Sequence, residues 1–293
     1  MNDTAQSADL AQFRQYLENL GRDIEPGSGF FIPGSVIWRV SREPALLLVG
    51  MRALLLQMAH PKVAQGVADH SRYREDPLGR GIRTFTAVYS LVFGSREEAI
   101  EAALRVRSVH NRVHGRVTDP LPAGMDPAYD ANDPDLLLWV AATLLDSAVL
   151  GYELFVEPLS DDEKEQHYQQ AKRFGQLFGI EEQRYPQSWP DFQNWWQQML
   201  HSDTLTVTDT ARDIHHGLLT GNWFTRLLAP FNYSVAASLL PERLAREFGL
   251  RRNLLTRMGF YPVLWMTRLL VKLVPRRLRG VPPARRGERR LPA

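Results

Sequence analysis

The amino-acid sequence predicts an all-α protein whose helices form a single compact domain. Apolar residues recur at spacings of three and four along most of the chain, as they do on the buried side of a helix. No stretch has the alternating pattern of a strand or the turn of a tight hairpin. The chain has 293 residues and 44% hydrophobic content, enough for a large core. We therefore expect about ten helices in one domain over residues 1–275.

The N-terminal part predicts three helices separated by a loop. Residues 1–24 have the spacing of a short amphipathic helix, and a loop rich in Gly and Pro follows over residues 27–35. Residues 36–58 predict a helix whose second half, ALLLVGMRALLLQMA, is apolar on nearly all sides. Such a helix belongs in the centre of a core. His60 ends it, and a further short helical stretch leads to His70.

The next two predicted helices are separated by Gly94. Asp76 and Pro77 are a plausible start for the first, although its two glycines weaken the opening turn and make the helix secure only from about Gly81. Ser95 and Glu98 form a capping box, so the second helix begins after Ser95 and its pattern extends to Thr118. Its apolar positions are Ala99, Ala103, Val106, His110, Val113 and Val117.

This spacing places His110 near the middle of the apolar stripe. A buried histidine there could be a ligand to a cofactor, or it could be an ordinary core histidine bonded to a backbone carbonyl. Periodicity reports burial and does not decide between the two.

The remaining chain predicts a long loop and then further helices. Residues 115–132 are rich in Pro, Gly and Asp. A second strongly apolar helix is expected over residues 134–155, and a capping box at Ser160 opens a helix over residues 161–178. The other expected helices cover residues 189–200 and 208–219, with several more over residues 223–273.

Composition excludes several classes of site. Cysteine is absent, so disulfides, zinc–cysteine sites, iron–sulfur clusters and thiolate-ligated or covalently attached haem are excluded. The polar N-terminus lacks the layout of a signal peptide, so we expect a cytoplasmic location. The apolar runs 45–58 and 260–274 are interrupted by charged residues, and we expect no membrane span.

The charge is concentrated at the C-terminus. The net charge is +2, yet residues 276–293 hold seven arginines against Glu288 alone. We expect this basic tail to be disordered. Together with the amphipathic segment before it, the tail could instead make a peripheral contact with an anionic membrane, and both readings stay open. We expect no nucleic-acid partner, because the basic run is terminal and lacks interleaved aromatic residues.

Two clusters of polar residues could carry chemistry. Arg80, Arg83 and Thr84 stand at i, i+3 and i+4 and would share one helix face, where two guanidinium groups could bind carboxylates or phosphates. The alternative is a solvated helix start. His110 and His114 have the spacing of a metal-binding pair, but Asn111 follows the first histidine where a zinc hydrolase has glutamate.

The other histidines and the usual motifs give weaker signals. His60 could be a helix cap or a second functional imidazole, and the adjacent His215 and His216 would diverge on a helix. No nucleophile elbow, Walker A loop or dinucleotide-binding fingerprint is present in the sequence, so hydrolase, P-loop and Rossmann chemistry have no support.

Four blocks of sequence together resemble a known family. They are HPKVAQGVADHS, RGIRTFTAVYSLVFGS, VRSVHNRVHG and DPDLLLWV, and the likeness covers about residues 27–240. The chain resembles the family that includes the fungal oxygenase MpaB and the rubber oxygenases called latex clearing proteins. The resemblance implies an all-helical fold with a non-covalently bound haem b in its core.

The resemblance also assigns roles to particular residues. His110 matches the histidine that binds the haem iron in the rubber oxygenases, with His114 beside it. Arg80, Arg83 and Thr84 match a motif on the other haem face, where Arg83 replaces a lysine that can cap the iron. An arginine stays protonated and cannot do so.

The sixth iron position is therefore expected to be open, bound by water, or filled by a residue such as His60 or His70. The carboxylate base of rubber cleavage has no clear counterpart, since Asp69 is the only acid between Val63 and His70.

These expectations define three hypotheses. The first is a haem-dependent oxygenase or related oxidoreductase, in which His110 binds iron and the arginines hold the haem propionates or position oxygen. Its partners would be dioxygen or peroxide and a small apolar substrate, of isoprenoid or aromatic type. The second is a haem-binding sensor or carrier without turnover. The third is a haem-free helical protein that binds a membrane surface.

Overall fold

The computed structural model describes residues 3–25, 27–71, 73, 75–220 and 223–290 and is predominantly helical. The first half of the chain contains α1 (Asp3–Leu20), α2 (Val36–Ser41), the 3-10 helix η1 (Pro44–Val49), α3 (Gly50–Met58), α4 (Pro61–His70), α5 (Pro77–Phe93), α6 (Arg96–His110), β1 (His114–Arg116), β2 (Ala128–Asp130) and α7 (Pro134–Phe155). The second half contains α8 (Asp161–Gln176), η2 (Glu182–Arg184), α9 (Trp189–His201), α10 (Asp209–Thr220), α11 (Trp223–Leu239), α12 (Glu242–Glu247), α13 (Leu254–Leu273), α14 (Arg276–Arg279) and α15 (Pro282–Glu288). The predicted all-α fold class is confirmed.

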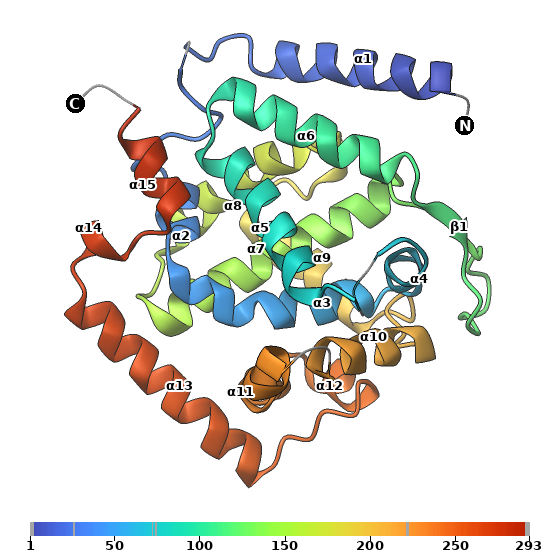
Figure 1. Cartoon of the computed structure of the whole chain (residues 1–293), viewed down its shortest axis with the longest axis vertical. Coiled ribbons are helices and arrows are strands. Elements are labelled where there is room, and N and C mark those ends of the chain that lie inside the picture. The colour runs from blue at the N-terminus through green and yellow to red at the C-terminus, as the bar shows by residue number, and fades with distance from the viewer. Residues whose placement is uncertain (1–2, 26, 72, 74, 221–222, 291–293) are drawn as a thin grey trace.

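Helix α7 occupies the centre of the protein and the other helices surround it (Figure 1). Its buried residues lie on most of its sides, and Trp139 stacks on Trp196 of α9 with ring centroids 5.2 Å apart. By length and composition α7 could cross a membrane, which differs from our expectation that no segment would qualify. However, 61% of its most apolar window is buried inside the protein, as in the core helix of a soluble domain.

The predicted helix over residues 36–58 is divided into three pieces. Helix α2 ends at Ser41, η1 begins at Pro44, and α3 continues from Gly50. Pro44 has no backbone N–H to continue a helix, but it is tolerated in the first turn of a new one. The division lets Arg52 of α3 face α7, where it is 5% exposed and forms an ion pair of 2.6 Å with Asp146.

The predicted helix over residues 95–118 is too long. Its capping box at Ser95 and Glu98 is present, but α6 ends at His110 and Asn111 is its C-cap. Beyond it, β1 and β2 pair antiparallel with Gly115 opposite Tyr129, in the region expected to be a loop. Gly115 permits this pairing, because a Cβ at that position would lie 2.6 Å from the Tyr129 hydroxyl. Val113 and Val117 therefore do not belong to the helix that carries His110.

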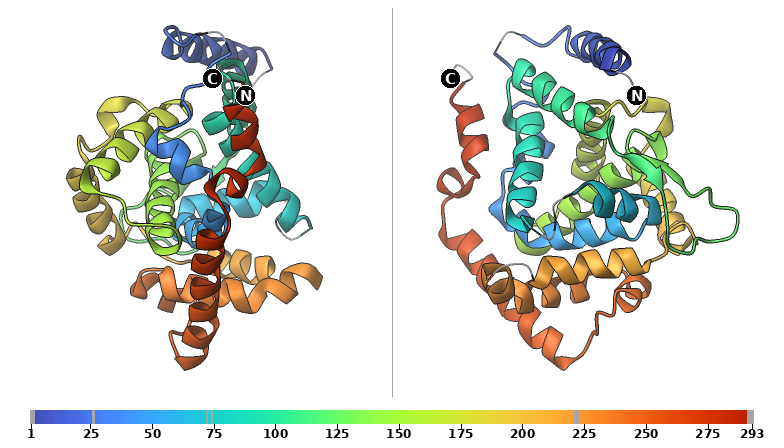
Figure 2. Two further views of the ribbon diagram at one scale, coloured as in Figure 1. Left: turned by 90° about the vertical axis from the view of Figure 1, so that its left-hand side faces the viewer. Right: turned by 45° about the vertical axis from the view of Figure 1, so that its right-hand side comes forward.

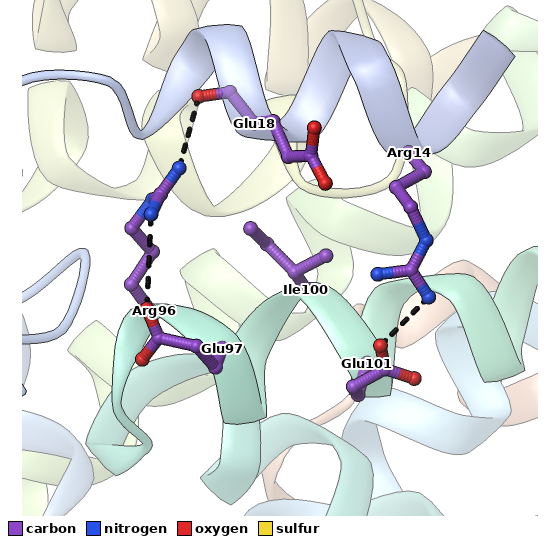
Figure 3. Close-up of a pocket in the computed structure, with 6 residues that line it drawn as sticks. All are labelled: Arg14, Glu18, Arg96, Glu97, Ile100 and Glu101. Carbon is purple, nitrogen blue, oxygen red and sulfur yellow. Dashed lines mark hydrogen bonds and ion pairs between the residues drawn. The ribbon is translucent and has the colours of Figure 1, made fainter. Parts of the chain in front are cut away.

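Helix α1 lies along the outer side of α6 (Figures 1 and 2). Arg14 pairs with Glu101 at 2.7 Å, and Arg96 donates to the carbonyl of Glu18 (Figure 3). Leu17 of α1 is fully buried in a hydrophobic cluster to which α5 and α6 also contribute. The charged groove between α1 and α6 is thus a packing interface whose Arg14 and Arg96 guanidinium groups have partners within it.

The C-terminal segment differs from the expected disordered tail. Residues 276–279 and 282–288 form α14 and α15, which run back along the body of the protein (Figure 2). Arg279 binds Glu43 at 2.6 Å, and Arg290 pairs with Glu98. Gly287 lies against the Trp38 ring, where a Cβ would approach to 2.6 Å. The basic residues that looked like a solvated tail therefore include several that attach it to the domain.

Candidate functional site

A cavity of about 460 Å³ lies between α3, α5, α7 and α8. Its walls are mainly apolar and include Leu54 of α3, Val88 of α5 and Leu145 of α7. It is lined by two residues of the predicted arginine motif, Arg80 and Thr84. A predominantly apolar cavity with a few polar groups is the usual form of a binding site for an apolar ligand or cofactor.

The structure separates the predicted arginine cluster. Asp76 caps α5 by accepting a hydrogen bond of 2.8 Å from the Gly79 backbone N–H, which confirms the predicted helix start. Its other oxygen binds Arg83 at 2.9 Å, and the Arg83 side chain is 63% exposed. Arg80 instead lines the cavity, where its Nη1 is buried and has no partner among the residues that the structure describes. Thr84 lines the cavity as well, and its hydroxyl donates to the Arg80 carbonyl at 3.0 Å.

A guanidinium nitrogen that is buried without a partner, as Arg80 Nη1 is among the described residues, indicates a site for an anion. Burial, with the nearby Arg83 charge, lowers the pKa of Arg80, which measures the cost of keeping this charge away from water. A carboxylate in the cavity would offset that cost through a charge-assisted hydrogen bond. The arrangement fits a cofactor or substrate with an apolar body and an acidic group.

His110 lies at the C-terminal end of α6 and is not among the residues that line the cavity. Its neighbours Arg107 and Asn111 both bind Asp9 of α1, at 2.7 and 2.8 Å. These contacts hold the end of α6 in place. Burial, followed by the Arg107 charge, lowers the pKa of His110 to about 4. Its imidazole is therefore neutral near pH 7, the state in which a ring nitrogen can bind a metal.

His114 and His60 occupy different environments. His114 is exposed on β1, so it does not share a helix with His110. His60 is the N-cap of α4: its Nδ1 accepts from the Lys62 backbone N–H at 3.3 Å. Burial lowers the pKa of His60 to about 4. Within the described chain, no group of three or more His, Cys, Asp or Glu side chains could hold a metal ion.

The histidine at the end of α4 and the nearby acid belong to a hydrogen-bonded cluster. Tyr129 of β2 donates to Asp69 at 2.6 Å, and its hydroxyl lies 3.2 Å from His70 Nε2. Gln65 also donates to Asp69, at 2.9 Å. The cluster attaches the β1–β2 hairpin to α4. Neither Asp69 nor His70 lines the cavity.

Sequence reasoning missed two polar residues of the cavity wall, His167 and Tyr185. His167 is 2% exposed, and both of its ring nitrogens are buried with no partner in the described part of the chain. The Tyr185 hydroxyl is also buried without a partner. His167, Ala171 and Phe174 line the cavity at spacings of four and three on α8. That spacing could have indicated a buried histidine, but the helix is otherwise polar.

Comparisons with known proteins match most of the chain to one family. Residues 38–276 match the catalytic domain described as ER-bound oxygenase mpaB/B'/Rubber oxygenase. The chain is 26% identical over 239 residues to the uncharacterized protein Mb2261 of Mycobacterium bovis, covering 79% of this chain and 91% of the relative. The uncharacterized protein Rv2237 of Mycobacterium tuberculosis matches with the same identity and coverage. No solved structure shows significant similarity.

Proposed function

Because the chain belongs to the family of mpaB/B' and rubber oxygenase catalytic domains, we propose that it is a haem b-dependent oxygenase that acts on an apolar substrate. The observation that carries the proposal is the cavity beside α5. It combines apolar walls with one guanidinium nitrogen, Arg80 Nη1, that is buried without a hydrogen-bond partner among the described residues. Haem b has an apolar macrocycle and two acidic propionates, so its chemistry fits both features.

His110 and Arg80 have separate roles in this proposal. The resemblance of the VRSVH segment and the neutral state of its imidazole support His110 as the iron ligand, whereas the lining of the cavity does not include His110 and gives this role no support. Arg80 would hold a propionate through its unpaired Nη1. Bound haem would supply the activation of dioxygen or peroxide. The apolar side chains of α3, α5 and α7 would exclude water and receive the substrate.

Arg83 and His60 do not lie where they could contact a ligand in the cavity. Arg83 binds Asp76 at the surface, so it acts in this proposal only by fixing the start of α5. The His60 side chain caps α4 through its Nδ1. Thr84 remains on the cavity wall, where it is available to a bound ligand.

An absorption spectrum of the purified protein loaded with haemin tests this function. We expect a Soret band with stoichiometric haem, a shifted band on dithionite reduction, and a further shift with carbon monoxide. His110→Ala should alter the band position and weaken binding, because it removes the proposed iron ligand. His114→Ala is the matched control and should leave the spectrum unchanged, since His114 is exposed on β1.

Oxygen uptake separates an oxygenase from a haem-binding sensor or carrier. The wild-type protein should consume oxygen when given a reductant and an apolar alkene or phenol, and His110→Ala should not. A normal haem spectrum without substrate-dependent oxygen uptake would favour the sensor. Absence of any haem band would reject haem dependence altogether.

A further inference from the structure

Two uncharged polar groups lie on the α8 side of the cavity, His167 and Tyr185. Each is more than nine-tenths buried, at 2% and 8% exposure, and each lines the cavity. Both His167 ring nitrogens and the Tyr185 hydroxyl lack a hydrogen-bond partner among the described residues. Buried polar groups are nearly always hydrogen-bonded in native proteins. Two such groups on one cavity wall therefore indicate a ligand that would provide the partners.

The distance between the two polar groups, measured along the axis of α8, indicates how long this ligand is. The Tyr185 hydroxyl lies over Gly175, where an added Cβ would stand only 1.5 Å from its oxygen. Gly175 is eight residues after His167 on the same helix, so the two polar groups are separated by about 12 Å along its axis. Ala171 and Phe174 line the cavity between them. The wall is thus polar at both ends and apolar in the middle.

Both groups are neutral at pH 7. Burial, followed by the Arg39 charge, lowers the pKa of His167 to about 4. Burial also raises the pKa of the Tyr185 hydroxyl, with smaller contributions from Tyr168 and Tyr16. A neutral imidazole and a phenol can each donate and accept one hydrogen bond. They are suited to hydroxyl or carbonyl groups, whereas a carboxylate would be better bound by Arg80.

We infer that this cavity binds an elongated apolar molecule with an uncharged oxygen group at each end, one bonded to His167 and the other to Tyr185. The inference deepens the proposed function by naming the substrate class. It concerns binding alone, so it can be tested whether or not the protein binds haem.

Displacement of the fluorescent dye N-phenyl-1-naphthylamine from the purified full-length protein tests this inference. The competitors are 1,10-decanediol, 1-decanol, n-decane and decanoate. We expect the diol to bind more tightly than the mono-alcohol, and the alcohol more tightly than the alkane. Tyr185→Phe and His167→Phe should each weaken diol binding about tenfold, since each removes one hydrogen-bonding group. Neither substitution should change the affinity for decane.

Two controls separate hydrogen bonding from a change in cavity shape. Tyr168→Phe removes a hydroxyl that donates to the Pro186 carbonyl outside the cavity, and it should leave diol binding unchanged. His167→Gln retains a donor and an acceptor and should restore part of the lost affinity. Equal binding of diol and alkane, or Phe variants that bind the diol normally, would overturn the inference and indicate ordered water at these groups.

A second surface carries an independent inference. Helix α13 lies at the outer edge of the protein (Figures 1 and 2). Several of its large apolar side chains are exposed to solvent. Leu254, Met258, Tyr261, Trp265, Leu269 and Leu273 define this α13 surface and are between 45% and 72% exposed. The opposite side of α13 packs through Phe260 and Leu264 into a core cluster. A continuous apolar surface of this kind marks an interaction site.

The positive charge of the segment that contains α13 indicates which kind of partner the α13 surface binds. Residues 248–287 contain ten lysines and arginines and no aspartate or glutamate. Arg257 and Lys272 on α13 are exposed and have no ion-pair partner among the described residues. A second copy of the chain would bring the same positive charge and would be repelled. We infer that the α13 surface docks on an anionic lipid bilayer, with Trp265 at the interface and the basic residues near the lipid headgroups.

Co-sedimentation of the full-length protein with lipid vesicles tests this second inference. We expect binding to phosphatidylcholine vesicles that contain phosphatidylserine, and much weaker binding to phosphatidylcholine alone or at high salt. The double substitution Trp265→Glu and Leu269→Glu should lower binding at least about tenfold, because it places charge on the apolar face. Arg257→Glu with Lys272→Glu should remove the preference for anionic lipid.

The matched control is Ile32→Glu, which places the same charge on an apolar side chain that is 58% exposed elsewhere on the protein. It should bind vesicles normally. Failure of the wild-type protein to bind anionic vesicles would overturn the inference. So would a dimer in analytical ultracentrifugation that the Trp265 and Leu269 substitutions dissociate, because the face would then belong to a second copy.

Discussion

The core of this protein contains two polar regions that differ in how well their groups are paired. Around Arg52, the guanidinium group binds Asp146 at 2.6 Å, the Ser147 hydroxyl at 2.6 Å and the Leu239 carbonyl at 2.9 Å. In the cavity, the His167 ring nitrogens and the Tyr185 hydroxyl have no hydrogen-bond partner within the described part of the chain. Paired groups link α3, α7 and α11 and stabilise the fold. Unpaired groups lower the stability of the empty protein and can be satisfied by a ligand.

The largest change in the free energy of unfolding should come from removing the Arg52 guanidinium group. Arg52→Met leaves Asp146 buried without its partner, so the free energy of unfolding should fall by about 3–5 kcal/mol. Urea unfolding followed by circular dichroism measures this. Arg14→Met is the matched control: its ion pair with Glu101 is roughly half exposed and should contribute at most about 1 kcal/mol. Similar losses for the two variants would mean that the Arg52 region is not a stabilising network.

A smaller change in the free energy of unfolding should follow from the protonation of His167 at low pH. The unfolded chain binds a proton at His167 below about 6.5, whereas the folded protein does so only near the lowered pKa of about 4. Because the unfolded chain takes up this proton first, the free energy of unfolding falls as pH decreases from about 6.5 to about 4.

His167→Phe should reduce this acid-induced loss of unfolding free energy by about 1–3 kcal/mol. Unfolding curves at several pH values give the result. His60, His110 and His215 also have pKa values lowered to about 4, so some acid sensitivity should remain in the variant. An unchanged pH profile would show that the His167 ring is not held neutral by burial.

The smallest effect should be a gain in stability. Tyr185→Phe removes a buried hydroxyl without a partner, so it should raise the free energy of unfolding by about 1 kcal/mol in ligand-free protein. Tyr168→Phe removes a hydroxyl that donates to the Pro186 carbonyl at 2.6 Å and should lower it by about 1 kcal/mol. Opposite signs for these two Tyr→Phe substitutions would sharpen the distinction between paired and unpaired groups. A loss in both would contradict it.

The sequence predicts the features that depend on local chemistry. The capping boxes at Ser95 and Ser160 are formed, since each requires only residues three positions apart. The end of α6 was not predictable in the same way. Val113 and Val117 continue a helical spacing by coincidence while belonging to the β1–β2 region, where pairing with Tyr129 and its neighbours decides the structure.

The cavity depends on contacts between distant parts of the chain. Arg80 and Thr84 could be identified because the motif sequence resembles a known family, but their separation from Arg83 depends on the position of Asp76. His167 lies in a polar helix, and only its contact with α3, α5 and α7 makes it part of the wall. The attachment of residues 282–290 to Trp38 and Glu98 likewise could not be seen from the basic composition of that segment.

The central claim is that the cavity between α3, α5, α7 and α8 is the site of function. A cavity-filling variant tests it directly. Ala171→Phe places a ring between His167 and Phe174, whereas Ala5→Phe places the same ring on an exposed position of α1. Haemin and 1,10-decanediol are titrated into both folded variants. We expect Ala171→Phe to weaken binding of both ligands, with Ala5→Phe unchanged. Normal binding of both ligands by Ala171→Phe would contradict the assignment of function to this cavity.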